Sequence, residues 1–227
     1  MPKAFRAVTP VLRLLVPAVF LAFFSVPAVQ ARDQDLADRI QRQYESITSF
    51  KTDFVQVLTN AASGESEVRT GTIFYQQPRL IRWETEEPEP ELLLVGKERV
   101  WQFFPEEEVA YRYQVDQIFQ SKTMLRFISG EANLKQDFKL EEVGEEHGWT
   151  KIKLIPKRPE PGLVLAYLWI EPDTALLRQI LLVDFFGNGN QLTLDDIERG
   201  ISLDPALFTF SPPAHVEVLE NPAGPES

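Results

Sequence analysis

The chain has 227 residues, a formal net charge of −11 at pH 7, no cysteine and two histidines. Without cysteine, a disulfide scaffold, a thiol nucleophile, a cysteine-ligated metal and lipid attachment to an N-terminal cysteine are all excluded. The excess of acids disfavours nucleic acid and anionic lipid surfaces as partners, so we expect no nucleic-acid binding.

The first 31 residues are typical of a secretory signal peptide. Lys3, Arg6 and Arg13 come before the apolar run LLVPAVFLAFFSVPAV, and small residues precede a cleavage point after Ala31. Two prolines interrupt the run, which favours a cleaved signal over a membrane anchor. Cleavage would remove three positive charges and leave 227 − 31 = 196 residues with a net charge near −11 − 3 = −14. We expect this mature protein to be soluble in the periplasm.

Residues 32–218 are predicted to form a single domain, and the polar, proline-rich residues 219–227 a loose tail. The domain begins with a helix that has acids at its start, where they complement the helix dipole. Its apolar residues recur at helical spacing: Leu36, Ile40, Tyr44 and Ile47.

From Phe50 onward, short apolar-alternating runs are separated by turn residues, which is typical of an antiparallel meander. About eleven strands are predicted: FKTDFVQVLT, VRTGTIFYQ, RLIRWET, ELLLVG, RVWQFF, EVAYRY, DFKLEEV, TKIKLIP, VLAYLWIE, LLRQILLVDFF and NQLTLDDI.

Residues 115–131 interrupt the strands with a helical pattern. Ile118, Leu125 and Ile128 share one face, and Gly130 is a suitable stop signal. The fold class is therefore α+β, with two or three helices that can cover one side of a large sheet.

The sequence offers little for catalysis or metal binding. His147 and His215 lie in separate loop-like stretches, and no nucleophile elbow, phosphate-binding loop or zinc-protease motif is present. The stretch DFFGNGNQ at 184–191 lacks the full ligand series of a calcium loop, so a hairpin turn is the better interpretation. We predict no catalytic residue, metal or cofactor. A hydrolase built on converging carboxylates stays a hypothesis, because sequence alone does not place acid pairs.

Large apolar side chains are instead concentrated on strand faces. Ile81 and Trp83 share one face of their strand, Trp101 and Phe103 share one face of theirs, and VLAYLWIE is apolar on both faces. Both an ordinary packed core and a curved sheet lined for an apolar ligand fit this pattern.

Three blocks resemble the LolA family of periplasmic carriers of outer-membrane lipoproteins. They are LADRIQRQYESITSFKTDFVQ, TGTIFYQQPRLIRWETEEPEPELLLVGKERVWQFFPE and ALFTFSPPAHVEV, and in this order they run from about Leu36 to Val218. The resemblance implies an incomplete, strongly curved antiparallel β-barrel whose helices form a lid over a hydrophobic cavity.

The resemblance also implies a function and partners. Such a carrier receives acylated lipoproteins from an inner-membrane ABC transporter, shields their acyl chains and delivers them to a receptor like LolB, and we expect it to act as a monomer. The alternative is a lipid- or lipoprotein-binding sensor of the same half-barrel fold. The acyl-chain site is predicted from four sheet residues and three lid residues: Ile81, Trp83, Trp101, Phe103, Ile118, Leu125 and Ile128.

One position departs from the family pattern. The family commonly has Arg directly before the proline of the second strand turn, where it holds the lid closed, and this chain has Gln77 there. Either the lid is held more weakly, or Arg79 or Arg82 takes over the contact.

Overall fold

The computed structural model describes residues 1, 28–121, 123–160 and 162–220. Most of the predicted signal peptide (2–27) and most of the predicted tail (221–227) lie outside the described residues. The elements in chain order are α1 (Ala28–Ser46), β1 (Ser49–Thr59), β2 (Ser66–Gln76), β3 (Leu80–Glu87), β4 (Glu91–Val95), β5 (Arg99–Phe104), β6 (Val109–Gln114), α2 (Val115–Ser121), α3 (Thr123–Ile128), α4 (Leu134–Asp137), β7 (Phe138–Glu146), β8 (Trp149–Pro156), β9 (Leu165–Ile170), β10 (Leu177–Val183), β11 (Gly189–Arg199), the 3-10 turn η1 (Pro205–Phe208) and β12 (Glu217–Glu220).

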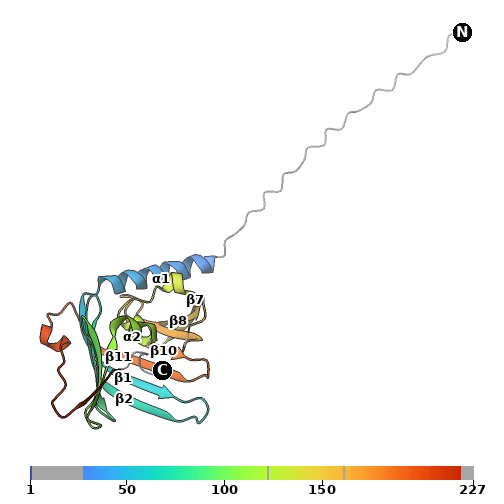
Figure 1. Ribbon diagram of the computed structural model, residues 1–227. Coiled ribbons are helices and arrows are strands. Elements are labelled where there is room, and N and C mark those ends of the chain that lie inside the picture. The colour runs from blue at the N-terminus through green and yellow to red at the C-terminus, as the bar shows by residue number, and fades with distance from the viewer. Residues whose placement is uncertain (2–27, 122, 161, 221–227) are drawn as a thin grey trace.

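A single curled sheet dominates the molecule, and the predicted fold class is confirmed (Figure 1). The strand order is β12-β6-β5-β4-β3-β2-β1-β11-β10-β9-β8-β7. The eleven predicted strands are β1 to β11, and their pairing is antiparallel throughout. The short β12, which was not predicted, crosses the expected domain end at residue 218 and pairs with β6 in parallel.

Register shifts help to curl the sheet. One lies between Thr70 and Gly71 in the pairing of β2 with β3, and bulges of this kind increase the local bend and twist. A Cβ atom on Gly71 would lie 1.9 Å from the backbone oxygen of Glu84, so only glycine allows this approach of the two strands.

The inserted helices lie inside the curl. In Figure 1, α2 sits between the green strands on the left and the strands labelled β7, β8 and β10 on the right. The predicted segment 115–131 forms α2 and α3, and Gly130 has a φ of +74°, as expected of a helix stop. We call residues 115–131 the lid.

Helix α1 lies across one end of the sheet (Figure 1). It begins at Ala28, four residues before the predicted Arg32, and has no acid in its first turn, so the expected match of acids to the helix dipole is wrong. The helix former Ala at positions 28 and 31 explains this extension. Ile40, with no exposed surface, joins α1 to the core, and Arg39 donates to the carbonyl of Pro172 at 2.7 Å.

The convex face of the sheet has a cover of its own. Residues 201–220, which we call the outer cover, contact β3 and β5 from the outside and end in β12, which extends the sheet beside β6 (Figure 1). Phe210 packs on Trp101 and Phe103, with ring centroids 5.6 and 5.2 Å apart. Arg82 donates to the carbonyl of Leu207 at 3.1 Å. Among the described residues, no helix is both long and apolar enough to span a membrane.

Candidate functional site

The concave face of the sheet carries one continuous apolar surface. Residues directly opposite each other on paired strands share a face, so the register defines it. One part is aliphatic and comes from β9, β10 and β11: Leu168, Ile180, Leu182, Leu192 and Leu194. The other part is richer in aromatic and branched side chains and comes from β1 to β4: Phe54, Ile73, Ile81, Trp83 and Val95.

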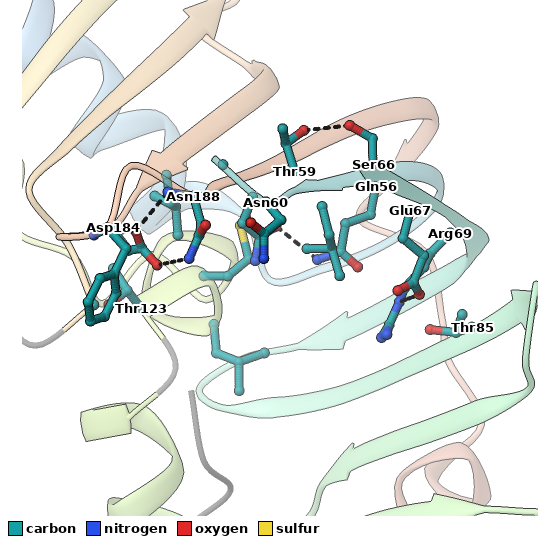
Figure 2. Close-up of a pocket in the computed structure, with 18 of the residues that line it drawn as sticks. Gln56, Thr59, Asn60, Ser66, Glu67, Arg69, Thr85, Thr123, Asp184 and Asn188 are labelled. Atoms are coloured by element: carbon teal, nitrogen blue, oxygen red, sulfur yellow. Dashed lines mark hydrogen bonds and ion pairs between the residues drawn. The ribbon is translucent and has the colours of Figure 1, made fainter. Parts of the chain in front are cut away.

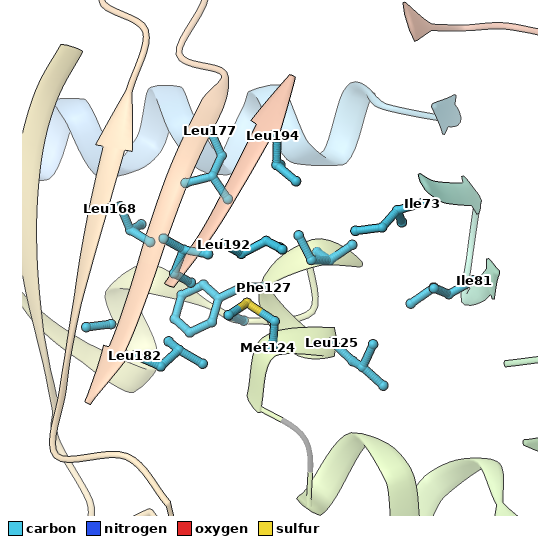
Figure 3. Packing of buried hydrophobic residues seen from close by; sticks show 14 of the residues in the cluster. Ile73, Ile81, Met124, Leu125, Phe127, Leu168, Leu177, Leu182, Leu192 and Leu194 are labelled. Atoms are coloured by element: carbon cyan, nitrogen blue, oxygen red, sulfur yellow. The ribbon is translucent and has the colours of Figure 1, made fainter. Parts of the chain in front are cut away.

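The lid fills this concavity. Four α3 side chains, those of Met124, Leu125, Phe127 and Ile128, are 2–7% exposed. Figure 3 shows the first three between the strands on either side of the curl. Ile118 of α2 belongs to the same buried cluster. The structure thus brings together five of the predicted site residues: Ile81, Trp83, Ile118, Leu125 and Ile128.

The predicted placement of Trp101 and Phe103 with these residues is wrong. Trp83 pairs with Leu93, and Leu93 pairs with Gln102, so Gln102 is the residue of β5 that faces the concave side at this level of the sheet. Trp101 and Phe103 therefore point to the convex face, where they contact the outer cover. Alternation showed that the two rings share a face, but which face is concave follows only from the register.

Arg79 ties the lid to the turn between β2 and β3. Its guanidinium donates to Glu131 and, at 3.2 Å, to Asp116, and it lies 5.2 Å from the ring centre of Phe119. The hydrogen bond with Glu131 raises the pKa of Arg79 above its ordinary value. Gln77 is exposed, and its backbone N–H donates to the carbonyl of Thr48 at 2.8 Å.

Two further side chains hold the lid, one from β2 and one from the lid itself. The hydroxyl of Tyr75 donates to the carbonyl of Ser129 at 3.2 Å. Burial, together with the charge of Glu131, raises the pKa of Tyr75 to about 12, so this donor stays protonated at neutral pH. At the other side of the lid, Arg126 donates to Glu160 at 2.9 Å and to Asp137 at 3.2 Å. Arg82, the other candidate latch, lies on the convex face and does not reach the lid.

A cavity of about 970 Å³ opens beside the lid (Figure 2). Its rim includes the β1–β2 turn and the β10–β11 turn. The carboxylate of Asp184 accepts from the backbone N–H groups of Phe186 and Asn188, both at 2.8 Å, which confirms a hairpin turn at this place. Strand β10 therefore ends at Val183, before Phe185 and Phe186, which are 83% and 80% exposed.

The cavity has an apolar wall and a polar wall. Trp83, Leu93, Met124, Leu125 and Leu182 form much of the apolar wall, and so it continues the buried surface under the lid. The polar wall contains Gln56, Arg69, Thr85, Glu91 and Asn190. Sequence reasoning missed this wall, although Gln56 and Thr85 alternate with apolar residues on the concave faces of β1 and β3.

The arrangement is suited to covering apolar surface. His147 and His215 are exposed in the β7–β8 turn and the outer cover. Among the described residues, no group of three or more metal-ligating side chains is arranged to hold an ion.

Comparisons with known proteins agree with this geometry. Residues 45–211 match the family model described as outer membrane lipoprotein carrier protein LolA. The chain belongs to the LolA family. An outer-membrane lipoprotein carrier protein from Methylococcus capsulatus is 31% identical over 183 residues, covering 81% of this chain and 86% of the relative. The protein of that name from Dechloromonas aromatica is 29% identical, covering 80% and 86%.

A solved structure supports the fold of this LolA-family chain. An uncharacterized conserved protein from Thermus thermophilus superposes with a TM-score of 0.54 at 16% identity, covering 83% of this chain and 98% of that one. The family is a family of carriers, and the predicted family membership is confirmed.

Proposed function

We propose that this chain is a non-enzymatic periplasmic carrier that shields the acyl chains of lipoproteins between the inner and outer membranes. The observation that carries the proposal is the concave apolar face, which the short helix α3 occupies through four buried side chains: Met124, Leu125, Phe127 and Ile128. An acyl chain needs a surface of this kind, and the lid occupies the same surface when no cargo is bound.

The magnitudes favour reversible exchange. Burying one acyl chain of about sixteen carbons gains on the order of 12 kcal/mol at about 0.8 kcal/mol per methylene. Burying four side chains of the α3 type gains roughly 6–12 kcal/mol at about 1.5–3 kcal/mol each. Because the lid gains at least about half as much as the acyl chain, undocking the lid offsets much of the gain from cargo, and cargo can be released as well as bound.

In this proposal, Arg79 is the lid latch that replaces the arginine missing at Gln77. It joins the sheet to both ends of the lid, since Asp116 lies in α2 and Glu131 follows α3. A closed fraction of the population lowers the apparent affinity for cargo, and so the latch would help to set how firmly cargo is held.

The proposed partners follow from the family. Acylated lipoproteins would be loaded by an inner-membrane ABC transporter and delivered to an outer-membrane receptor like LolB. The carrier would act as a monomer after its signal peptide is removed. Its excess of acids would limit adhesion to the anionic bilayers between which it moves.

The proposal is tested by a release assay. The mature protein is added to spheroplasts that retain an acylated lipoprotein in the inner membrane, and the supernatant is examined for a soluble one-to-one complex. We expect release that depends on both the added protein and ATP. A cargo whose acylated cysteine is replaced by serine is the control for dependence on the acyl chains.

If a folded protein releases nothing from spheroplasts with an active transporter, the carrier proposal is wrong. Tight binding of lipopeptide in solution without release would instead support a lipid-binding sensor with the same fold.

A further inference from the structure

The cavity beside the lid is strongly acidic. Four carboxylates line it, those of Glu65, Glu67, Glu91 and Asp184, against the single guanidinium of Arg69, which gives a net charge of −4 + 1 = −3 for the lining. No lysine or histidine is among its described lining residues. A ligand that reaches the apolar wall passes these charges.

The single cation is already paired. Arg69 contacts Glu67 at 2.5 Å through Nε and Glu91 at 3.3 Å through Nη1. Since two carboxylates share this guanidinium, an incoming anion would meet a local excess of negative charge instead of a free cation.

Hydrogen bonds from the neighbouring strands hold Glu91 in position. Its carboxylate accepts from Gln102 at 2.7 Å, and the hydroxyl of Tyr113 donates to Gln102 at 3.2 Å. Gln102 and Tyr113 are 8% and 3% exposed, so Glu91 is held in a buried network, whereas Glu65 and Glu67 are exposed at the rim of the cavity.

The same wall offers a neutral donor. Thr85 is 7% exposed and lines the cavity, and its hydroxyl forms no hydrogen bond with the described residues. Figure 2 shows it beside Arg69. A hydroxyl in this position suits a carbonyl oxygen, which is an acceptor without charge.

We propose that the polar wall is a charge filter that admits the uncharged ester and amide linkages of an acylated lipoprotein terminus and rejects the phosphodiester of membrane phospholipids. This inference rests on the proposed carrier function. Both kinds of lipid have the same acyl chains, so the apolar wall cannot tell them apart. Only the groups that join the chains differ, and specificity then requires a repulsive element against the more abundant lipid.

The test compares two lipids and two matched double variants. The probes are a synthetic triacylated-cysteine peptide of neutral sequence and dipalmitoyl phosphatidylglycerol, each presented in neutral detergent micelles. Bound lipid is counted by native mass spectrometry. Glu67→Gln/Glu91→Gln, called the wall variant, removes two charges from the cavity lining, one in the polar wall and one at the rim, and keeps an acceptor oxygen at each position. Glu106→Gln/Glu107→Gln removes two charges from the exposed β5–β6 turn, outside the cavity.

We expect the wild type and the turn variant to prefer the lipopeptide. The wall variant should bind phosphatidylglycerol about tenfold more tightly, a change of about 1.4 kcal/mol, with little change for the lipopeptide. In about 1 M salt, charges are screened beyond about 3 Å. The affinity of the wild type for phosphatidylglycerol should then approach that of the wall variant.

If the wall variant and the turn variant bound phosphatidylglycerol equally more tightly, the cause would be the total charge of the protein, and the proposed filter would be wrong. An unchanged preference in the wall variant, with the fold verified by circular dichroism, would overturn it as well. In both cases wild-type binding of the lipopeptide would leave the carrier proposal standing. A wild type that binds neither lipid overturns both proposals.

Discussion

The sheet carries large apolar side chains on both faces, and each face has a cover of a different kind. The lid occupies the concave face with short helices and buried apolar side chains, both aliphatic and aromatic. The outer cover follows the convex face with one short 3-10 turn and aromatic contacts, and it ends in a strand at the edge of the sheet. The two covers bury chemically similar surfaces, so any difference in how easily they leave depends on their attachment.

The attachments differ in type. Side chains hold the lid: Tyr75 in β2 and Arg79 in the β2–β3 turn bond to it, and Arg126 of the lid bonds to Glu160 in the β8–β9 loop. The outer cover is joined by backbone hydrogen bonds near both ends. The N–H of Gly200, directly before it, donates to the carbonyl of Ser49, and β12 pairs with four residues of β6.

In the proposed function, this contrast lets one face of the sheet exchange its cover for cargo while the other face keeps its cover. Exposed ion pairs contribute about 0–1 kcal/mol each, so a few of them can break when a ligand competes. A paired strand must lose several backbone hydrogen bonds together, which makes departure of the outer cover more costly.

The largest expected effect separates two tryptophans on opposite faces. Trp83→Ala removes a ring that lines the cavity and packs on Phe54 at 5.1 Å, whereas Trp101→Ala removes a ring under the outer cover. Each should lower the free energy of unfolding, by about 3 kcal/mol for the buried Trp83 and less for Trp101. Only Trp83→Ala should also impair lipoprotein release per folded molecule.

Urea denaturation measures the loss of stability, and the spheroplast assay, run at a temperature at which both variants are folded, measures release. Equal loss of release in the two variants would show that the faces do not divide function in this way.

The next effect concerns the packing of the lid. Phe127→Ala removes a ring 5.6 Å from that of Phe138, and this should cost the closed form about 2 kcal/mol. Where the closed form dominates, the apparent affinity for a lipopeptide should rise by up to about thirtyfold. Amide hydrogen exchange should also become faster in α3. The affinity for the lipopeptide is measured by fluorescence titration.

The matched control for this prediction is Phe210→Ala, which removes a ring from the outer cover. It should lower the free energy of unfolding and leave the affinity unchanged. A weaker affinity in Phe127→Ala, with exchange in α3 unaltered, would argue against competition between lid and cargo.

Sequence patterns predicted the strands well because alternation and turn residues act locally. Ile81 and Trp83 were placed on one face by their spacing, and Gly130 ended the lid as its backbone freedom allows. The start of α1 was missed because good helix formers precede the acids that marked the expected cap.

The site was less predictable because it depends on pairing between distant strands. Trp101 and Gln102 are neighbours in the chain, and only the register with β4 shows that Gln102 is the concave one. The contact of Arg79 with Glu131 joins residues 52 positions apart. No local pattern signals a pair of this kind, which explains why Gln77, Arg79 and Arg82 stayed open alternatives.

A smaller effect distinguishes the latch from its counterpart outside. Arg79→Gln breaks the contacts with Asp116 and Glu131, and since Arg79 is 44% exposed the closed form should lose only about 1 kcal/mol. Apparent affinity for the lipopeptide should then rise about fivefold. Arg82→Gln affects the outer cover and should leave affinity unchanged. If Arg82→Gln raised the apparent affinity more than Arg79→Gln, Arg82 and not Arg79 would be the residue that holds the lid closed.

The smallest effect lies at the edge of the outer cover. A hydrogen bond from Arg112 lowers the pKa of Glu220 from its ordinary value. Because the folded-state pKa is depressed, the stabilisation is present above the unfolded pKa of about 4.3 and is lost as the pH falls through the lower folded value. An NMR titration should show this low midpoint, and Arg112→Gln should return it towards about 4.3. An unchanged midpoint would mean that the pair does not hold this edge. Since the side chains of Arg112 and Glu220 are 38% and 63% exposed, we expect acid to loosen only the end of β12, while the rest of the outer cover stays in place.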